Sequence, residues 1–445
     1  QPIPPELLPA YPQYEDLMIQ EFPAAYVIPA DAPFQVSQHQ PARLVDFLLF
    51  NDVQVHQASE DFELDHDGDP TSPKVEYPQG SYVVWMNQPK RGMANTILED
   101  GLDLSDIPGL YFYSPPSVWS NARLWGADLA VMEERIDIPT NEIKAADEPQ
   151  GSVEDGTAGA YAYAPTSIAA IQATNELLAS GATLYRAEAP FDDSGRIFEA
   201  GTFILPADVG IANDLAQQYG LEVLVLAGKP EGAIQMRQQR VAALMQVGGR
   251  SMLDRFGFEF DAISVQELNT GPDLTAYDVF VNESVSLTTQ GLSNKGRKAL
   301  EDFFAAGGDY VGLGSRGSDL AKEVGLLDFS EYNPPGNSIA RVDFAVGDPV
   351  SAGFGDEGYV FVNSTALFSD LGDGVEIAAS LDEAGFFVSG YWPGWDDSGA
   401  YGAAVVIHKT TGEQDVTLIG FDALFRAHPE NGCRMVANAI YNGLE

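Results

Sequence analysis

The chain has 445 residues, 45% of them hydrophobic and 20% charged, which is enough for about three domains. Its 66 Asp and Glu residues outnumber its 23 Lys and Arg residues, which gives a formal net charge of −43 at pH 7. Such a charge repels nucleic acid and anionic membranes, and the apolar runs are far shorter than the roughly 20 residues of a membrane span. We therefore expect neither nucleic acid as a partner nor a membrane span.

The composition also indicates where the protein works. Only eight of the basic residues are Lys, and a carboxylate-rich, lysine-poor surface is typical of extracellular proteins from high-salt or marine environments. An ordinary secreted protein is the alternative. Cys433 is the only cysteine, so we expect no intramolecular disulfide and a small buried residue in the last helix. The chain starts at Gln1 without Met or a leader, which predicts a processed product or a fragment.

The first half of the chain contains an internal repeat. The stretch "FLLFNDVQVHQASEDF" (47–62) aligns without gaps to "ELLASGATLYRAEAPF" (176–191), and "YPQGSYVV" (77–84) aligns to "FEAGTFIL" (198–205). A strand that ends in Pro opens each copy, "YVIP" (26–29) and "AYAP" (162–165). The repeat predicts two related small α/β lobes, each with a helix over one sheet face.

The expected organisation follows from these copies. We assign a linker or strap to 1–25, the first α/β repeat to 26–140, an acidic linker to 141–159, the second repeat to 160–230 and a larger domain to 231–445. This larger domain has an inserted β-rich segment near 336–400.

The first copy has eight extra residues, which fall on "ELDHDGDPTSP" (63–73). Asp65, Asp67 and Asp69 alternate, and Glu76 stands twelfth from Asp65, which is the ligand spacing of a calcium loop. Pro70 occupies the sixth position, where such a loop needs Gly, and the segment leads toward a strand. Calcium binding and a solvated acidic hairpin tip both remain open.

From about residue 240 strands alternate with helices. "VAALMQ", "DAISV", "YDVFVN" and "DYVGLG" are predicted strands, and "SNKGRKALEDFFAAGG" is an amphipathic helix that Gly307 and Gly308 end. "AAVVIHKTTGEQDVTLIGFD" is a predicted hairpin, and "CRMVANAIYNGL" is the last helix, with Asn431 as its expected N-cap. The pattern predicts an α/β fold with a flavodoxin-like, doubly wound parallel sheet.

A possible catalytic triad spans two motifs of this domain. "GLGSRGSDLAKEVGLL" (312–327) is a strand-to-helix turn that could be a nucleophile elbow, a phosphate loop or a structural turn. If Ser315 were the nucleophile, His428 of "FRAHPENG" would be the general base and Glu430 would orient it.

Here the chain resembles the class I glutamine amidotransferase-like fold, in which an elbow carries Cys and a late His-x-Glu completes the triad. His428 and Glu430 match that pair, but the nucleophile position is Gly314 in one register and Ser315 in the next. The resemblance therefore implies the fold without amidotransferase chemistry, and a serine hydrolase stays an alternative.

A second resemblance covers nearly the whole chain. "ARLVDFLLFNDVQVHQA", "YPQGSYVVWMNQPKRGMANTILED", "SVWSNARLWGADLAVM" and "LIGFDALFRAHPENGCRMVANAIYNGL" are similar to the region downstream of the catalytic domain in large secreted bacterial zinc carboxypeptidases. That family binds zinc through a His-x-x-Glu pair and a distant His, and no His-x-x-Glu occurs in this chain. The resemblance thus implies an accessory region whose zinc belongs to an upstream peptidase domain.

Five tryptophans lie in Pro- or Gly-punctuated segments and could line a groove for a peptide or glycan, or instead fill interfaces between lobes: Trp85, Trp119, Trp125, Trp392 and Trp395. Three functions follow from these observations. The first is a non-catalytic accessory portion of a secreted zinc carboxypeptidase, for substrate positioning, domain docking or extracellular assembly. The others are the Ser315 hydrolase and a structural extracellular protein that self-associates.

Overall fold

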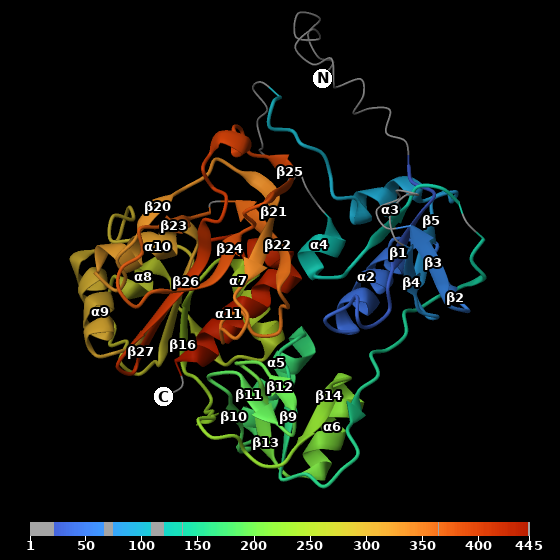
Figure 1. Ribbon diagram of the computed structural model, residues 1–445. Coiled ribbons are helices and arrows are strands. Elements are labelled where there is room, and N and C mark those ends of the chain that lie inside the picture. The colour runs from blue at the N-terminus through green and yellow to red at the C-terminus, as the bar shows by residue number, and fades with distance from the viewer. Residues whose placement is uncertain (1–21, 66–73, 108–119, 136, 364, 444–445) are drawn as a thin grey trace, which may run out of the picture.

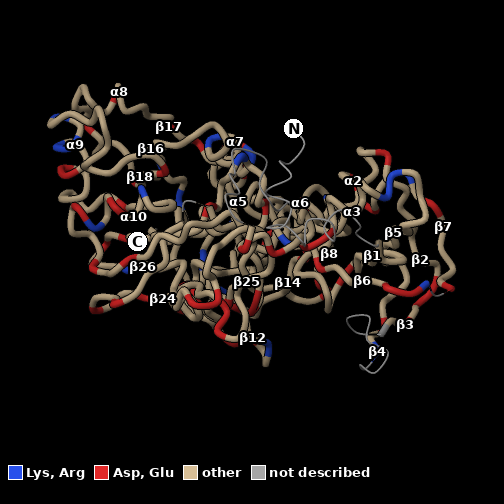
Figure 2. Tube along the Cα trace, turned by 90° about the horizontal axis from the view of Figure 1, so that it is seen from above, with Lys and Arg blue, Asp and Glu red and all other residues tan. Residues whose placement is uncertain are grey.

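The protein consists of two small lobes and one large domain, each built on its own sheet (Figure 1). The computed structural model describes residues 22–65, 74–107, 120–135, 137–363 and 365–443. No helix in these ranges is both long and apolar enough to cross a membrane. Acidic residues are spread over both lobes and the large domain, and basic residues are sparse between them (Figure 2).

The first lobe has a five-stranded sheet in the order β6-β1-β5-β2-β7. Its elements are β1 (Ala25–Ile28), α2 (His39–Phe50), β2 (His56–Ala58), β3 (Phe62–Asp65), β4 (Lys74–Tyr77), β5 (Tyr82–Trp85), α3 (Arg91–Leu98), α4 (Asn121–Trp125), β6 (Ala130–Met132) and β7 (Thr140–Glu142). Alternate residues of β1 point to opposite faces. Tyr26 and Ile28 pack with the helices, whereas Ala25 and Val27 pack under the β3–β4 hairpin.

The second lobe repeats this plan with one extra edge strand, in the order β15-β10-β13-β9-β14-β8. Its elements are β8 (Ser152–Val153), β9 (Ala160–Tyr163), α5 (Ile168–Ala179), β10 (Tyr185–Arg186), β11 (Phe191–Asp193), β12 (Arg196–Phe198), β13 (Phe203–Pro206), α6 (Val209–Tyr219), β14 (Glu222–Leu226) and β15 (Ile234–Gln235). Tyr161 and Tyr163 face the helices, and Ala160 and Ala162 lie with Phe198 of the β11–β12 hairpin.

The strand pairing of the two lobes corrects one part of the sequence alignment. Tyr26 pairs with Val84, and Tyr161 pairs with Leu205. Since the alignment equates Val84 with Leu205, the counterpart of Tyr26 is Tyr161, one residue earlier than the alignment places it. The reason is that the alignment matched Pro29 to Pro165. Pro29 follows its strand directly in the first lobe, whereas Pro165 comes one residue later after its strand in the second lobe.

The large domain has a twelve-stranded sheet whose parallel part is β17-β16-β18-β19-β27. The elements around this part are β16 (Val241–Leu244), α7 (Val247–Phe256), β17 (Phe260–Ala262), α8 (Val265–Leu268), β18 (Val279–Asn282), α9 (Asn294–Ala305), β19 (Asp309–Leu313), α10 (Gly314–Glu323), β27 (Gln414–Ile419) and α11 (Glu430–Asn442). The domain is therefore α/β with a parallel, helix-covered sheet, as the sequence pattern predicted.

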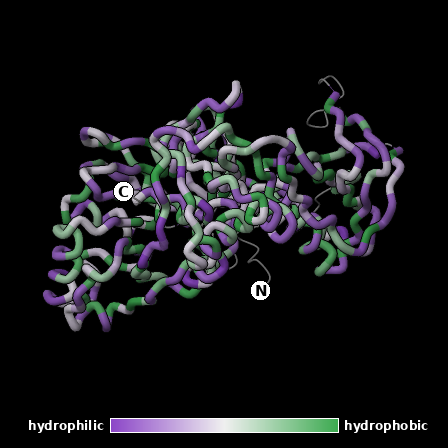
Figure 3. The backbone as a smooth tube through the Cα atoms, turned by 90° about the horizontal axis from the view of Figure 1, so that it is seen from below, coloured by the Kyte–Doolittle hydropathy of each residue, from purple (hydrophilic) through white to green (hydrophobic). Residues whose placement is uncertain are grey.

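Antiparallel strands extend the same sheet beyond β27. They are β20 (Ser330–Tyr332), β21 (Asn337–Phe344), β22 (Glu357–Asn363), β23 (Leu367–Ser369), β24 (Glu376–Leu381), β25 (Phe387–Tyr391) and β26 (Ala404–Thr411), with the short 3-10 helices η3 (Trp395–Asp397) and η4 (Phe425–Ala427). β26 joins the two parts because it pairs antiparallel with both β27 and β24. Hydrophobic and hydrophilic stretches alternate along the chain in the lobes and the large domain (Figure 3).

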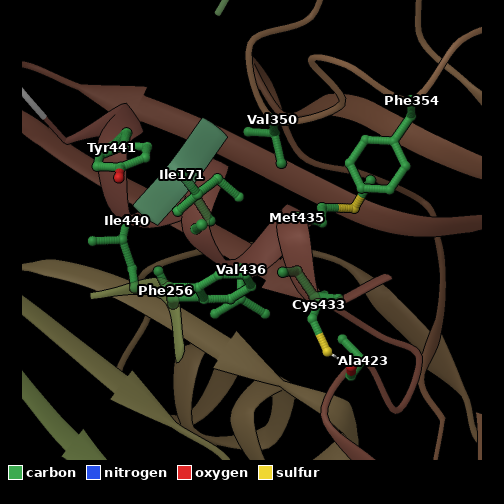
Figure 4. Close-up of a cluster of buried hydrophobic side chains, with 14 of the residues drawn as sticks. Ile171, Phe256, Val350, Phe354, Ala423, Cys433, Met435, Val436, Ile440 and Tyr441 are labelled. Carbon is green, nitrogen blue, oxygen red and sulfur yellow. Dashed lines mark hydrogen bonds between the residues drawn. The ribbon is translucent and has the colours of Figure 1, made fainter. Parts of the chain in front are cut away.

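Helix α11 lies in the centre of the core, and nearly all of its residues are buried. Figure 4 shows Val436 and Ile440 of α11 beside Phe256 of α7. Cys433 is fully buried, and its Sγ–H donates to the carbonyl oxygen of Ala423 at 3.0 Å. The prediction that Asn431 caps this helix is wrong: the helix begins at Glu430 after Pro429, and Asn431 Oδ1 accepts from Arg434 instead.

Candidate functional site

A cavity of about 960 Å³ lies at the carboxyl ends of the parallel strands. Parallel strands place their following loops along one sheet edge, and ligands of open α/β sheets bind in the crevice there. The loops after β16, β18, β19 and β27 all contribute to this elbow cavity, which is lined by Gln246, Val247, Gly248, Arg250, Glu283, Leu313, Gly314, Ser315, Arg316, Asn363, Phe421, Asp422, Ala423, Leu424, Phe425 and Arg426.

The turn from β19 into α10 has the backbone of a nucleophile elbow. Gly314 has φ +57°, a left-handed conformation that costs L-residues with a side chain about 1–2 kcal/mol. Strand and helix also approach closely, since a Cβ on Gly317 would lie 2.5 Å from the carbonyl carbon of Gly312. This backbone geometry decides which residue stands at the nucleophile position of the elbow, a choice that the sequence left open. Gly314 occupies the elbow position, and Ser315 is the next residue, within α10.

The structure places the three predicted triad residues in different surroundings. Ser315 is half-buried and lines the elbow cavity. Glu430 lines a second, smaller cavity, where Arg43 and Arg255 bind its carboxylate at 3.2 and 2.7 Å. His428 lines neither of these two cavities.

His428 belongs to the contact between the large domain and the first lobe. Its carbonyl oxygen accepts a hydrogen bond from Trp125 Nε1 at 2.8 Å, and the two rings lie edge to face with centroids 6.3 Å apart. Burial lowers the pKa of His428 to about 4, although the charge of Glu430 acts in the opposite direction. The ring is therefore neutral at pH 7, and the triad of Ser315, His428 and Glu430 stays a prediction.

Two carboxyl groups that the sequence analysis did not single out, those of Glu283 and Asp422, line the elbow cavity. Burial, together with the charge of Glu283, raises the pKa of Asp422 to about 7, against a hydrogen bond from Asn363 at 3.1 Å. Burial also raises the pKa of Glu283, which accepts a hydrogen bond from the backbone N–H of Gln246 at 2.8 Å. At neutral pH this pair can keep a proton, so it can donate as well as accept hydrogen bonds.

Three arginines, Arg250, Arg316 and Arg426, bring positive charge to the same cavity. None of them forms an ion pair with a described residue. The cavity also contains the first residues of α7 and α10, whose N-termini carry partial positive charge. Arg426 and Ala427 have φ of +52° and +57°, and such strained backbone is concentrated at functional sites. The arrangement suits a polar ligand with a negatively charged group.

Trp392 and Trp395 act as packing residues, Trp85 and Trp125 each also line a cavity, and Trp119 lies outside the described residues. Trp392 is fully buried against Phe386, so the prediction that it contacts substrate is wrong. Trp85 and Trp125 are also buried. The half-buried Trp395 stacks on Phe387 at 4.8 Å and donates to Asp103 Oδ2 at 3.1 Å. Their rings fill contacts between distant segments, which was the alternative interpretation.

The predicted calcium ligands are only partly described. Asp65 ends β3, where its backbone pairs with Lys74, and Glu76 lies exposed on β4 opposite Glu63. Asp67 and Asp69 lie outside the described residues. Calcium binding at this hairpin therefore stays a prediction.

The sequence did contain a signal for the cavity residues that were missed. Glu283 follows β18 by one residue, and Asp422 follows β27 by three. Charged residues directly after buried parallel strands meet at one sheet edge, which is where they gather here.

Comparison with known proteins gives weak structural matches only. No protein-family model and no curated protein matches the chain. A glutamine amidotransferase from Thermotoga maritima matches with 13% identity over 47% of this chain and 100% of that chain, at a TM-score of 0.33. A protein described as a GMP synthase subunit from Thermoplasma acidophilum has 14% identity, coverages of 46% and 94%, and a TM-score of 0.33.

A β-galactosidase from Rahnella sp. R3 matches with 13% identity over 52% of this chain and 34% of that chain, at a TM-score of 0.29. At these scores the likeness carries no argument about activity. The α/β class of the large domain is evident from its own strand order. The comparisons add nothing to the carboxypeptidase resemblance, which stays a prediction.

Proposed function

We propose that this chain is a non-catalytic accessory portion of a secreted zinc carboxypeptidase, in which the elbow cavity binds a polar ligand without cleaving it. Gly314 is the observation that carries this function. An elbow holds its nucleophile at the residue with the left-handed backbone, and here that residue has no side chain. The motif similarity along the chain supports the peptidase as its covalent partner, with zinc in the upstream domain.

The elbow cavity offers recognition groups in place of a nucleophile. Arg250, Arg316 and Arg426 supply guanidinium donors for an anionic group, and Glu283 and Asp422 supply carboxyl groups in the same cavity. A protein or peptide substrate presents both anionic groups and amide N–H donors. Binding such a chain would hold it near the peptidase domain and raise its local concentration there.

An extracellular location fits this role. The chain carries a formal charge of −43, and acidic residues are spread over both lobes and the large domain (Figure 2). Salt screens the self-repulsion of such a surface, which supports secretion into a saline medium.

The first test is to read the precursor upstream of Gln1. A domain with His-x-x-Glu and a distant His is expected there. If the precursor contains only a secretion leader, the peptidase role is wrong.

The second test measures peptide hydrolysis by that full-length precursor. The double variant Arg316→Gln, Arg426→Gln should raise KM severalfold and leave kcat unchanged, since it removes binding groups that do not belong to the zinc-binding domain. Lys298→Gln, on the exposed face of α9, is the matched control and should change neither constant. An unchanged KM in the double variant would refute a binding role of the elbow cavity.

The serine-hydrolase alternative is tested with a fluorophosphonate probe, which labels only activated serines. Ser315 lines the cavity, but Glu430 is held by two arginines and His428 packs on Trp125. We expect that the probe does not label Ser315, so that the Ser315→Ala variant and the wild type are labelled to the same extent. Labelling of Ser315 in the folded protein would establish the hydrolase instead. The self-association alternative predicts a concentration-dependent mass in light scattering.

A further inference from the structure

A second cavity, of about 250 Å³, lies where the first lobe, the second lobe and the large domain meet. Figure 1 shows α5 of the second lobe next to α11, with α4 of the first lobe nearby. We call this space the junction cavity. It is lined by His39, Gln40, Arg43, Trp125, Ser167, Ile168, Ala169, Gln172, Arg255, Glu430, Asn431 and Arg434, none of which lines the elbow cavity.

The junction cavity has an excess of positive charge. Arg43, Arg255 and Arg434 line it, and Glu430 is the only carboxylate among the lining residues. Glu430 is shared between Arg43 at 3.2 Å and Arg255 at 2.7 Å. Three guanidinium groups against one carboxylate leave two positive charges uncompensated within the cavity, in a protein whose net charge is −43.

Arg434 is the most unusual of the three arginines. Its residue is only 2% exposed, and its guanidinium donates to neutral acceptors: Nη1 to the carbonyl oxygens of Pro165 and Gly353, both at 2.8 Å, and Nη2 to Asn431 Oδ1 at 2.6 Å. Nε is buried without an acceptor among the described residues. A buried charge without a counter-ion is costly, so such a guanidinium indicates a place for an anion.

The first turn of α5 supplies further donors. Ser167 caps this twelve-residue helix by accepting from the backbone N–H of Ala170 at 3.1 Å. The amides of Ile168 and Ala169 have no acceptor among the described contacts, and both residues line the cavity. Unused amides at a helix N-terminus, together with the helix dipole, favour a negatively charged group.

We propose that the junction cavity binds a small oxyanion, of the carboxylate or phosphate class, between Arg434, Arg255 and the first turn of α5. The volume of about 250 Å³ suits a small ion with its hydration water. Because the lining residues come from all three structural units, the bound ion fixes their relative positions. This is a structural anion site, separate from the ligand binding proposed for the elbow cavity.

Thermal unfolding of the whole chain tests this site. Melting temperature is measured against sodium phosphate or sodium acetate, with sodium chloride keeping the ionic strength constant, because salt alone stabilises such an acidic protein by screening. One of the two oxyanions should raise the melting temperature in a saturable way. A larger effect of phosphate or of acetate identifies the class, and equal effects of all three salts overturn the proposal.

Two variants assign the response to the junction cavity. Ala169→Asp places a carboxylate in the first turn of α5 and should weaken the oxyanion response at least tenfold in apparent affinity. Val209→Asp adds the same charge to the first turn of α6, away from the cavity, and should leave the response unchanged. If Ala169→Asp does not fold, Gln172→Glu serves the same purpose.

A variant in the elbow cavity tests whether the oxyanion binds there instead of in the junction cavity. A response that Arg316→Gln abolishes and Ala169→Asp leaves intact would mean that the oxyanion binds at the elbow, and the junction site would be wrong. Loss of the response in Ala169→Asp alone supports the junction site whether or not the elbow cavity binds substrate.

Discussion

Asp422→Asn is expected to stabilise the protein at alkaline pH and to have little effect at acidic pH. Asp422 lies between Asn363 and the charge of Glu283 in the elbow cavity, and burial together with this neighbour raises its pKa to about 7. Because the folded pKa lies above the unfolded one, the favourable contribution of the carboxyl is fully present below about pH 4. It is lost as the pH rises through about 7.

The magnitude follows from the two pKa values. The difference between the ordinary 3.8 and about 7 corresponds to about 4 kcal/mol in the free energy of unfolding, at 1.36 kcal/mol per pKa unit. Asp422 keeps part of its surface in the cavity, where water screens its charge, so we expect about 2 kcal/mol. Asn keeps the acceptor oxygen for Asn363 and carries no charge at any pH.

Urea unfolding of both proteins between pH 4 and pH 8.5 measures this difference. Subtracting wild type from variant removes the general effect of the net charge, which is nearly common to both. The difference in the free energy of unfolding between Asp422→Asn and wild type should grow with pH and level off above about pH 7. A gap that is constant across the range, or that shrinks with pH, would refute the assignment of a raised pKa to Asp422.

Asp278→Asn is the matched control, because the pKa of Asp278 is shifted in the opposite direction to that of Asp422. Burial raises the pKa of Asp278, but hydrogen bonds from Arg240 and the ion pair with Arg237 outweigh it and lower the pKa to about 2. This stabilisation is present above about pH 4 and is lost as the pH falls toward 2. The variant should therefore be about 2 kcal/mol less stable than wild type at pH 7.

The remaining predictions concern the elbow, the tryptophans and the lobe contact. Gly314→Ala should cost about 1–2 kcal/mol in urea unfolding because of its left-handed backbone, whereas Gly228→Ala, with open space and no positive φ, should cost less. Trp392→Ala should lower stability by about 3–5 kcal/mol, and an unchanged melting temperature would contradict its packing role. Glu430→Gln should lower the free energy of unfolding by about 2–3 kcal/mol, since Arg43 and Arg255 lose their shared partner. Limited proteolysis should then separate the first lobe from the large domain more readily than in the wild type. Equal resistance of variant and wild type to the protease would argue against this contact.

Local pattern was sufficient for the regular elements of the large domain. The spacing of Leu300, Phe303 and Phe304 predicts one buried helix face, and α9 buries all three. Gly307, with φ +87°, follows the end of that helix as expected. The hairpin of β26 and β27 also follows from its two apolar runs and its Gly412 turn. Each of these signals lies within a few residues of the feature it predicts.

Long-range contacts decided the features that the sequence could not predict. Trp395 stands in a Gly- and Pro-punctuated segment, and its stacking on Phe387 and its hydrogen bond to Asp103, almost three hundred residues earlier, make it a packing residue. Glu430 looked like an orienter of His428 because the two are close in sequence, whereas Arg43 of α2 and Arg255 of α7 take up its carboxylate. The elbow register depended on the φ of Gly314, which a glycine-rich motif does not reveal.

The position of β27 determines when the large domain can form during synthesis. β27 lies between β19 and β26 in the sheet, and α11, which follows it, fills the core beneath. While the ribosome is still translating residues 414–442, β19 has an unpaired edge and the central core has no helix. The two small lobes, complete by residue 235, can fold first, and the large domain must wait for the last strand and helix. Until then its exposed strand edge is a place where a chaperone, or a second nascent chain, could bind.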